Sequence, residues 1–474
     1  MSEKFDVVII GAGPGGYPAA IRASQLGKTV AIIDKGTIGG ECLNWGCIPS
    51  KAMISASDFY YKAKTESSQM GISIDNISVD LPKLKAWKQS IQDRLIGGIK
   101  QLLKTNKVKT YLGTAKVLNR NQVSVDLNEG GNLTIDFDSL IVATGTEFIS
   151  IPGFDIDETF ILSSKGLFDL DHLPDELICI GGGIIGIELG TVFAKLGSKV
   201  KVVELLPQLL TGIDKRIVRY VEKKLKKLEV DVFLESKGKS YSIKNGKINL
   251  TIETKDGEQV ITGNKILLSI GKKASTEGLN LVAAGIKLDK RGFIIVDKQQ
   301  RTNVSNIYAI GDCTGLPFLA HKATKQGIIA AEVISGKNSI SDFKSMPSAI
   351  FTDPEIAIAG ITEAEAKEKG MDVMVGQAAF AASGRAMSIL EEDGFVRIIS
   401  DANDGVLLGV EIVGPHATDL ISEAALALEM GATVEDVGFT VHPHPTLPEM
   451  IMEAAEAIEG KAIHIPNARK RKKK

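Results

Sequence analysis

Two cysteines stand five residues apart near the start of the chain, in the segment GGECLNWGCIPSK at residues 39–51. Cys42 and Cys47 could form a redox-active disulfide, but five residues of ideal α-helix rise about 7.5 Å, which exceeds comfortable disulfide reach. A disulfide therefore requires an irregular turn, which Gly46 and Pro49 would favour. If a helix starts near Pro49, both sulfurs lie near its positive end, where thiols become more reactive. The alternative is a pair of structural thiols.

A second set of candidate groups lies in the segment VHPHPTLPEM at residues 441–450. A catalytic histidine needs a carboxylate that orients its far nitrogen. Glu449 follows His444 by five residues, with prolines that force a turn and then a helix start. From spacing alone, either His442 or His444 could instead be a core or surface residue.

Glycine-rich loops with the pattern G-x-G-x-x-G occur twice, each after an apolar run and before a helical pattern. The glycines are Gly11, Gly13 and Gly16 in the first copy and Gly181, Gly183 and Gly186 in the second. An acid follows the first glycine of each copy by 23 residues, Asp34 and Glu204 respectively. Such a loop lets the backbone approach a pyrophosphate at a helix N-terminus, while the acid accepts hydrogen bonds from the adenosine ribose. We therefore expect two dinucleotide cofactors; the alternative is that one copy is a structural turn.

The residues around Glu204 bear on which dinucleotide the second loop binds. They read KVVELLP, with no arginine just beyond the acid that could bind a 2′-phosphate. The carboxylate itself would repel that phosphate, so the pattern favours NAD over NADP.

Hydrophobic patterning predicts the elements that position these groups. Continuous apolar runs at residues 5–10 and 29–33 are typical of strands buried in a parallel sheet, and residues 15–27 have helical spacing. Residues 177–204 repeat this strand, loop, helix and strand order. Further expected strands and helices are, in order, helical residues 57–110, strands over 111–142, a helix over 215–228, strands over 240–270, a helix from about 321, strands at 350–359, 395–399 and 406–413, and helices near 362–370, 417–430 and 446–459.

Composition excludes several classes of protein. The 474 residues, with 44% hydrophobic and 24% charged side chains, are typical of a globular protein of about three domains. Aromatic residues make up 5% and the net charge is −2, which argues against nucleic-acid binding. The apolar stretch Leu177–Ala194 contains five glycines and is interpreted as strand, loop and helix rather than a membrane span. The N-terminus shows no targeting segment, and the basic residues 466–474 are interpreted as a solvated tail.

An ordered set of motifs resembles the flavin-dependent pyridine nucleotide–disulfide oxidoreductases over nearly the whole chain. The redox motif is matched by residues 39–51 and the domain-closing Ala-Thr-Gly by residues 143–145. Gly311 and Asp312, followed by LAHKA at residues 319–323, match the flavin-ribityl motif, and residues 444–449 match the C-terminal His-Pro-Thr-Leu-x-Glu. The resemblance is greatest to members that oxidise a protein-bound dihydrolipoyl group with NAD.

This resemblance implies an α/β fold with two Rossmann-like dinucleotide-binding domains and a C-terminal α+β dimerisation domain. The implied division is residues 1–150 for FAD, 151–275 for NAD, 276–345 as a central segment completing the FAD domain, 346–465 as the interface domain and 466–474 as the tail. It also implies a head-to-tail homodimer that serves lipoyl-bearing acyltransferases or a lipoyl carrier protein, and we expect a cytoplasmic location.

Residue roles follow from the same resemblance. Cys42 is the expected interchange thiol, Cys47 the flavin-facing thiol, and His444 the base that Glu449 orients, while His442 is assigned a structural role. Glu188, a carboxylate in an apolar helix, is expected to pair with Lys51 beside the flavin. Besides the two glycine loops, their acids and Lys51, the expected cofactor-binding residues are Gly113, Thr144, Gly145, Gly311, Asp312 and Ala320 for FAD, and Ile184 and Gly271 for NAD.

Several positions depart from the family pattern. Glu41 stands where threonine is usual, Trp45 replaces a smaller residue, and SIGKKAST at residues 269–276 differs from SIGRRPNT. Asp34 replaces the commoner glutamate, and prolines flank the histidine at positions 443 and 448. None of these departures removes a chemical group that the family's reaction needs, but Glu41 adds a negative charge beside the thiols.

Other members of the family remain alternatives. Those that reduce disulfides with NADPH normally carry basic residues near position 205, and those with a second dithiol need extra cysteines near the C-terminus; no cysteine follows Cys313. The remaining alternative is a non-catalytic subunit that retains the fold.

Overall fold

The computed structural model describes residues 3–467, so the predicted tail lies mostly outside the described residues. The described chain divides into two compact units, each assembled from three separate stretches. One unit comprises residues 1–53, 80–172 and 267–342, and the other comprises residues 54–79, 173–266 and 343–474. The five-part division made from the sequence stays a prediction.

The first unit contains the sheet expected for the first dinucleotide domain. Strand β1 (Glu3–Ile10) pairs in parallel with β2 (Val30–Asp34) and β5 (Asn132–Val142), because its buried apolar run VVII can contact neighbours on both sides. Strand β3 (Lys109–Asn119) continues the sheet beyond β2, and β16 (Ile307–Ala309) joins it beyond β5. The antiparallel strand β4 (Gln122–Leu127) connects β3 with β5.

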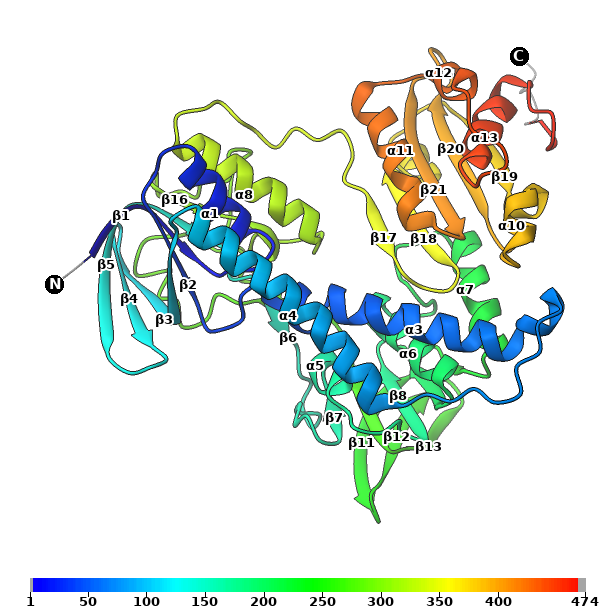
Figure 1. Cartoon of the computed structure of the whole chain (residues 1–474), viewed down its shortest axis with the longest axis horizontal. Coiled ribbons are helices and arrows are strands. Elements are labelled where there is room, and N and C mark those ends of the chain that lie inside the picture. The colour runs from blue at the N-terminus through cyan, green and yellow to red at the C-terminus, as the bar shows by residue number, and fades with distance from the viewer. Residues whose placement is uncertain (1–2, 468–474) are drawn as a thin grey trace. The chain divides into compact units, whose positions relative to one another are not determined.

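Helices α1 (Gly16–Gln25) and α8 (Ala320–Ile334) pack together beside this sheet (Figure 1). The antiparallel pair β6 (Thr146–Phe148) and β15 (Lys272–Ala274) lies in the same unit. Its remaining elements are α2 (Gly40–Asn44), α4 (Leu81–Thr105), β7 (Ile161–Leu162), α5 (Ser164–Phe168) and the short 3₁₀ helix η2 (Gly311–Thr314). Helix α3 (Cys47–Thr65) and strand β14 (Lys265–Leu268) run from one unit into the other.

The second unit repeats the strand–loop–helix–strand order in β8 (Glu176–Ile180), α6 (Ile184–Leu196) and β9 (Lys199–Val203). Strand β9 pairs in parallel with β8 and with β10 (Asp231–Phe233), which makes this a second Rossmann-like sheet. The other elements of this part are η1 (Ser67–Met70), α7 (Lys215–Lys227) and the antiparallel strands β11 (Lys237–Lys244), β12 (Lys247–Thr254) and β13 (Gly257–Gly263).

The C-terminal part of this unit is an antiparallel sheet with helices on one face (Figure 1). Its strands are β17 (Ser348–Ile350), β18 (Glu355–Gly360), β21 (Leu407–Gly414), β20 (Phe395–Asp401) and β19 (Val373–Ala379), in spatial order. Helices α11 (Ala417–Met430) and α13 (Glu449–Glu459) bury apolar side chains against this sheet. The remaining elements are α9 (Glu363–Glu368), η3 (Phe380–Ala382), α10 (Gly384–Ser388) and α12 (Val434–Phe439).

The fold class is confirmed: two Rossmann-like sheets and a C-terminal α+β domain are present. Strand β19 was not expected from the sequence. Its Gly376 is needed because a Cβ there would lie 2.0 Å from the Ala454 carbonyl oxygen of α13. The apolar stretch from Leu177 is strand, loop and helix, as expected. Among the described residues, no helix is long and apolar enough to span a membrane.

Candidate active site

The two redox cysteines lie on different helices. Cys42 belongs to the short helix α2, and Cys47 is the first residue of α3, two residues earlier than the helix start expected at Pro49. The break between the helices provides the irregular turn that a disulfide requires. A Cβ at Gly46 would lie 3.1 Å from the Cα of Cys42, so glycine permits the close approach of the chain there.

The side chains of Cys42 and Cys47 are hydrogen-bonded to each other. The hydrogen bond with Cys47 and burial both raise the pKa of Cys42 above its usual value, while Lys51 acts in the opposite direction. In the reduced pair Cys42 therefore keeps its proton at neutral pH. This arrangement suits the predicted roles, in which Cys47 carries the negative charge, and those roles stay predictions.

Gln92 holds the end of helix α2 in place, a role that the sequence analysis missed. This side chain is 2% exposed, and its amide nitrogen donates to the carbonyl oxygens of Leu43 and Asn44 at 3.0 and 2.7 Å. No local motif marks it, because Gln92 lies on α4 and reaches α2 only through tertiary packing.

The first glycine loop has the backbone geometry that a bound pyrophosphate requires. Gly11 has φ +103°, and a Cβ at Gly16 would lie 1.8 Å from the Gly11 carbonyl oxygen. Asp34 accepts from the Ala12 N–H at 2.8 Å, and its second oxygen accepts from the Thr37 N–H at 2.6 Å. The acid thus orders the loop itself, in addition to its expected role toward a ribose.

Other predicted FAD contacts of the first unit stay predictions, and their surroundings in the structure are as follows. The Thr144 hydroxyl oxygen is buried and has no hydrogen-bond partner among the described residues. A Cβ at Gly113 would lie 2.4 Å from the Asp126 carbonyl oxygen, so this position admits only glycine. Burial raises the pKa of Asp312, and the positive charges of Lys322 and Lys272 partly offset this increase.

The remaining predicted FAD contacts lie at turns and helix starts of the same unit. Gly145 and Gly311 have φ +67° and +74°, and the Gly311 N–H donates to Gln326 at 2.8 Å. Ala320 begins α8. A buried hydroxyl without a partner beside glycine-shaped backbone is the arrangement expected of a site for a large cofactor.

The second glycine loop repeats this geometry. Gly181 has φ +107°, Gly183 caps α6 with open space where a Cβ would lie, and Gly186 is buried within α6. Glu204 accepts from the Gly182 N–H at 2.6 Å and the Leu206 N–H at 2.8 Å. The other two predicted NAD contacts are Ile184, which is 44% exposed, and Gly271, which has φ +123°. They belong to different units.

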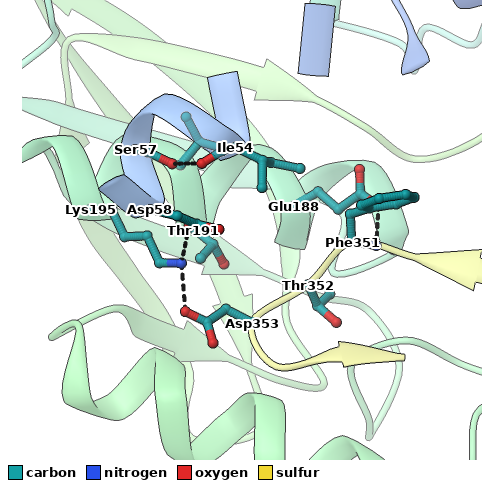
Figure 2. Close-up of a pocket in the computed structure, with 10 residues that line it drawn as sticks. Ile54, Ser57, Asp58, Glu188, Thr191, Lys195, Phe351, Thr352 and Asp353 are labelled. Carbon is teal, nitrogen blue, oxygen red and sulfur yellow. Dashed lines mark hydrogen bonds and ion pairs between the residues drawn. The ribbon is translucent and has the colours of Figure 1, made fainter. Parts of the chain in front are cut away.

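Glu188 is buried within α6, as its apolar surroundings predict, with 5% of its surface exposed. Its carboxylate accepts from the backbone N–H of Phe351 at 2.8 Å, a contact that the sequence does not reveal (Figure 2). Lys51 belongs to the other unit, so the predicted pairing of these two residues stays a prediction.

Further along α6, Lys195 and two carboxylates form a cluster of charges that holds the helix in place (Figure 2). The Lys195 ammonium, with 4% of its side chain exposed, pairs with Asp58 and Asp353 at 2.5 Å each. Burial lowers the pKa of Lys195, but the two carboxylates outweigh it and the net shift is upward. These residues and Glu188 line a cavity of about 10 Å³, which is the space that one water molecule occupies.

The C-terminal histidines have different environments. His444 is 82% exposed, and its Nδ1 lies 2.8 Å from Oε1 of Glu449, which begins α13 directly after Pro448. The second oxygen of Glu449 accepts from the Thr446 N–H at 2.6 Å. Burial raises the pKa of Glu449, but these two contacts outweigh it, so the carboxyl stays ionised. A carboxylate on Nδ1 leaves Nε2 of His444 exposed as the basic nitrogen.

His442 is buried, and both of its ring nitrogens have hydrogen-bond partners. Its side chain is 4% exposed, its Nε2 lies 2.8 Å from Glu423 of α11, and its Nδ1 lies 2.8 Å from the Thr440 carbonyl oxygen. The hydrogen bond with Glu423 raises the pKa of His442, although burial opposes it. The folded state thus binds the proton more tightly than the unfolded chain does.

The raised pKa of His442 predicts a pH-dependent stability. The stabilisation should be complete below the usual histidine pKa of about 6.5 and should be lost as pH rises through the higher folded value. The melting temperature of wild type should therefore exceed that of His442→Gln by more at pH 5.5 than at pH 9. Glu423→Gln, which removes the carboxylate, should abolish the pH dependence; an equal difference at both pH values would contradict this account.

Comparison with known proteins places these features in a family. Residues 5–327 match the model for "Pyridine nucleotide-disulphide oxidoreductase", and residues 346–455 match its dimerisation domain. The chain belongs to the pyridine nucleotide–disulphide oxidoreductases. Members of this family use FAD and NAD, in agreement with the two glycine loops, and the match to the dimerisation domain supports a homodimer.

Relatives within the family are similar over nearly the full length. The dihydrolipoyl dehydrogenases of Haloferax volcanii and Geobacillus stearothermophilus are each 44% identical, and each match covers 98% of this chain and 98% of the relative. LpdA of Mycobacterium tuberculosis has a TM-score of 0.89 at 28% identity, covering 96% of this chain and 99% of that structure. The HOCl-induced flavoprotein disulfide reductase RclA of Escherichia coli has a TM-score of 0.84 at 25% identity, covering 95% and 99%.

Proposed function

We propose that this protein is a dihydrolipoyl dehydrogenase, which reoxidises protein-bound dihydrolipoyl groups with NAD as the final electron acceptor. The observation that carries the proposal is the hydrogen-bonded cysteine pair, in a chain that has two dinucleotide loops and whose full-length relatives at 44% identity carry this activity in their names. The paired His444 and Glu449 supply the base that thiol oxidation requires.

The cysteines carry out the sulfur chemistry. A thiolate of the dihydrolipoyl group attacks Cys42 of the oxidised pair, which forms a mixed disulfide and releases Cys47 as a thiolate. The second substrate thiol, deprotonated, then attacks the substrate sulfur of the mixed disulfide, which closes the lipoyl disulfide and releases Cys42. The enzyme's two thiols hold the two electrons gained.

His444 removes the substrate proton. A thiol with a pKa well above neutrality is mostly unreactive at pH 7, so a base beside it accelerates attack. The exposed Nε2 accepts the proton, and Glu449 stabilises the resulting imidazolium through Nδ1. FAD, held by the first glycine loop, would supply the two-electron redox chemistry that links the enzyme thiols to NAD. Lys51, four residues after Cys47 on the same face of α3, places a positive charge beside this transfer.

We propose that the active site is shared between the two subunits of the homodimer, with His444 of one chain serving the cysteines of the other. Exposed apolar side chains surround the histidine segment, as a dimer interface requires. They are Leu426 (65% exposed), Met430 (75%), Phe439 (88%) and Val441 (92%). The substrates would be lipoyl-bearing acyltransferases or a lipoyl carrier protein, and the proposed location is the cytoplasm.

The visible spectrum of the purified protein tests this function. The oxidised protein should show a flavin spectrum, and dihydrolipoamide or NADH should each produce a long-wavelength charge-transfer band. The protein should also catalyse the reduction of NAD by dihydrolipoamide. A protein without flavin absorbance, or one with a band but no dihydrolipoamide-dependent reduction of NAD, would contradict the assignment.

Cofactor preference at the second loop can be reversed by substitution. Glu204 both repels a 2′-phosphate and holds the Gly182 N–H, and Leu205 beside it is 64% exposed. The double variant Glu204→Gln with Leu205→Arg keeps an acceptor for the loop and adds a cation. We expect its kcat/KM ratio for NADP over NAD to rise by at least about tenfold, which corresponds to about 1.4 kcal/mol.

Glu204→Gln alone is the matched control, because it removes the charge and adds no cation. Its preference should shift less than that of the double variant. Equal use of NADPH and NADH by the unmodified protein would show that Glu204 does not select NAD.

A further inference from the structure

Glu41, the acidic residue that departs from the family pattern beside Cys42, has a partner 231 positions away. Its carboxylate forms an ion pair with the ammonium of Lys272, and both residues belong to the same unit. The Glu41 side chain is 29% exposed and the Lys272 side chain 10%. A largely buried pair of this kind is less screened by solvent than a surface ion pair.

Lys272 is held in place by its strand. It is the first residue of β15 and lies opposite Phe148 of β6, with its ammonium 4.6 Å from the centre of that ring. Burial lowers the pKa of Lys272, and the negative charge of Asp312 partly offsets this effect. The ammonium therefore has one carboxylate from the redox segment and another from the predicted flavin site.

Glu41 alone would oppose formation of a thiolate at the cysteine pair. Reduction of a disulfide creates negative charge on sulfur, and a carboxylate on the adjacent residue disfavours that charge. Lys51 favours the thiolate of Cys42, whereas the neighbouring sulfur of Cys47 disfavours it. Tyr17 of α1 also faces Cys42, but burial raises its pKa and it stays neutral.

We propose that Lys272 is a positioning residue that neutralises Glu41 and thereby keeps the reduced cysteine pair ionisable near neutral pH. The inference rests on the proposed function, since it concerns the thiols that would carry the substrate's electrons. Asp312 also interacts electrostatically with Lys272, and Lys322 interacts with Asp312, so the Lys272 ammonium is influenced by both sites. Glu41 and Lys272 act as one neutral unit, and either one alone leaves an uncompensated charge.

The test compares three variants by the pH dependence of thiol reactivity. Lys272→Met should raise the pH midpoint for iodoacetamide alkylation of the reduced cysteines by about one unit, because the Glu41 carboxylate next to Cys42 in the chain is then uncompensated. Glu41→Gln should lower the midpoint by a similar amount. The double variant should return to within a few tenths of a unit of wild type. Peptide mapping assigns the alkylated cysteine, and this readout requires no bound flavin.

Lys273 provides a matched control. It is the next residue of the same strand, is 46% exposed, and pairs with Glu147 and Glu277 rather than with the redox segment. Lys273→Met should leave the alkylation midpoint unchanged. In FAD-loaded protein, the pH midpoint of the charge-transfer band should shift in the same directions as the alkylation midpoint.

Three outcomes would overturn the proposal: no shift in Glu41→Gln, shifts of the same sign in both single variants, or an equal shift in Lys273→Met. If Lys272→Met does not fold, Glu41→Gln decides alone, because glutamine is isosteric with glutamate. Failure of the proposed function is distinguishable. Wild type would then lack dihydrolipoamide-dependent NAD reduction while the alkylation shifts persisted.

Discussion

Cys42→Ser should abolish dihydrolipoamide oxidation yet retain the charge-transfer band when the flavoprotein is reduced and reoxidised. Serine cannot form the mixed disulfide with substrate, so turnover should fall by more than about 10³-fold. Cys47 remains as the thiolate beside the flavin in this variant. The absorbance of its long-wavelength charge-transfer band is the measurement.

Cys47→Ser is the complementary variant. It should lose the same activity by a similar factor, because no internal disulfide can form, and it should also lose the long-wavelength band. The flavin-facing sulfur is missing in this variant, and Cys42, the expected interchange thiol, does not donate charge to the flavin. The opposite spectral pattern would exchange the roles of the two cysteines.

His444→Gln should slow lipoamide turnover by about 10²–10⁴-fold, the range that a positioned general base contributes. Oxidation of NADH by an artificial electron acceptor, which bypasses the thiol step, should change much less. Glu449→Gln should have a smaller effect than loss of the imidazole, because it removes the charge on Nδ1 while leaving Nε2 as the base. Steady-state rates for both acceptors, measured on the same preparations, decide the matter.

Mixed dimers test whether the site is shared between subunits. His444→Gln and Cys42→Ser chains are each inactive with lipoamide, but a head-to-tail heterodimer would contain one complete site. Mixing and reassembly should therefore restore part of the activity. Near-normal lipoamide activity in His444→Gln, or equal loss with the artificial acceptor, would contradict the role of His444; no recovery on mixing would contradict the shared site.

His442→Gln is the matched control for the histidine experiment. It lies two residues from His444 but is 4% exposed and bonded to Glu423, so its loss should alter stability more than the ratio of the two activities. A selective loss of lipoamide turnover in His442→Gln would instead move the base to that position.

The local motifs were predictable because their chemistry lies within short stretches of sequence. Both glycine loops, the break between the helices that carry Cys42 and Cys47, and the helix start at Glu449 depend on neighbours along the chain. Glycine conformations and helix starts are decided within a few residues. The two Rossmann-like units followed from the repeated strand–loop–helix order for the same reason, whereas the C-terminal α+β domain was implied by the family resemblance.

Sequence patterning alone could not identify strand β19. Its residues VMVGQAA lack strict alternation, and Gly376 is there to admit the backbone of α13 rather than to favour a strand. Tertiary packing thus overrides local preference at this sheet edge.

By itself, the sequence determined which chemical groups are present and which backbone turns hold them: a cysteine pair, two dinucleotide loops and a histidine with its carboxylate. Only the tertiary structure decided the partners of isolated charges. Glu41 pairs with Lys272, Glu188 accepts from the Phe351 N–H, and His442 is bonded to Glu423. These partners lie on different elements, and a buried charge is stabilised by whichever opposite charge or hydrogen-bond donor packing brings within reach, irrespective of its distance along the chain.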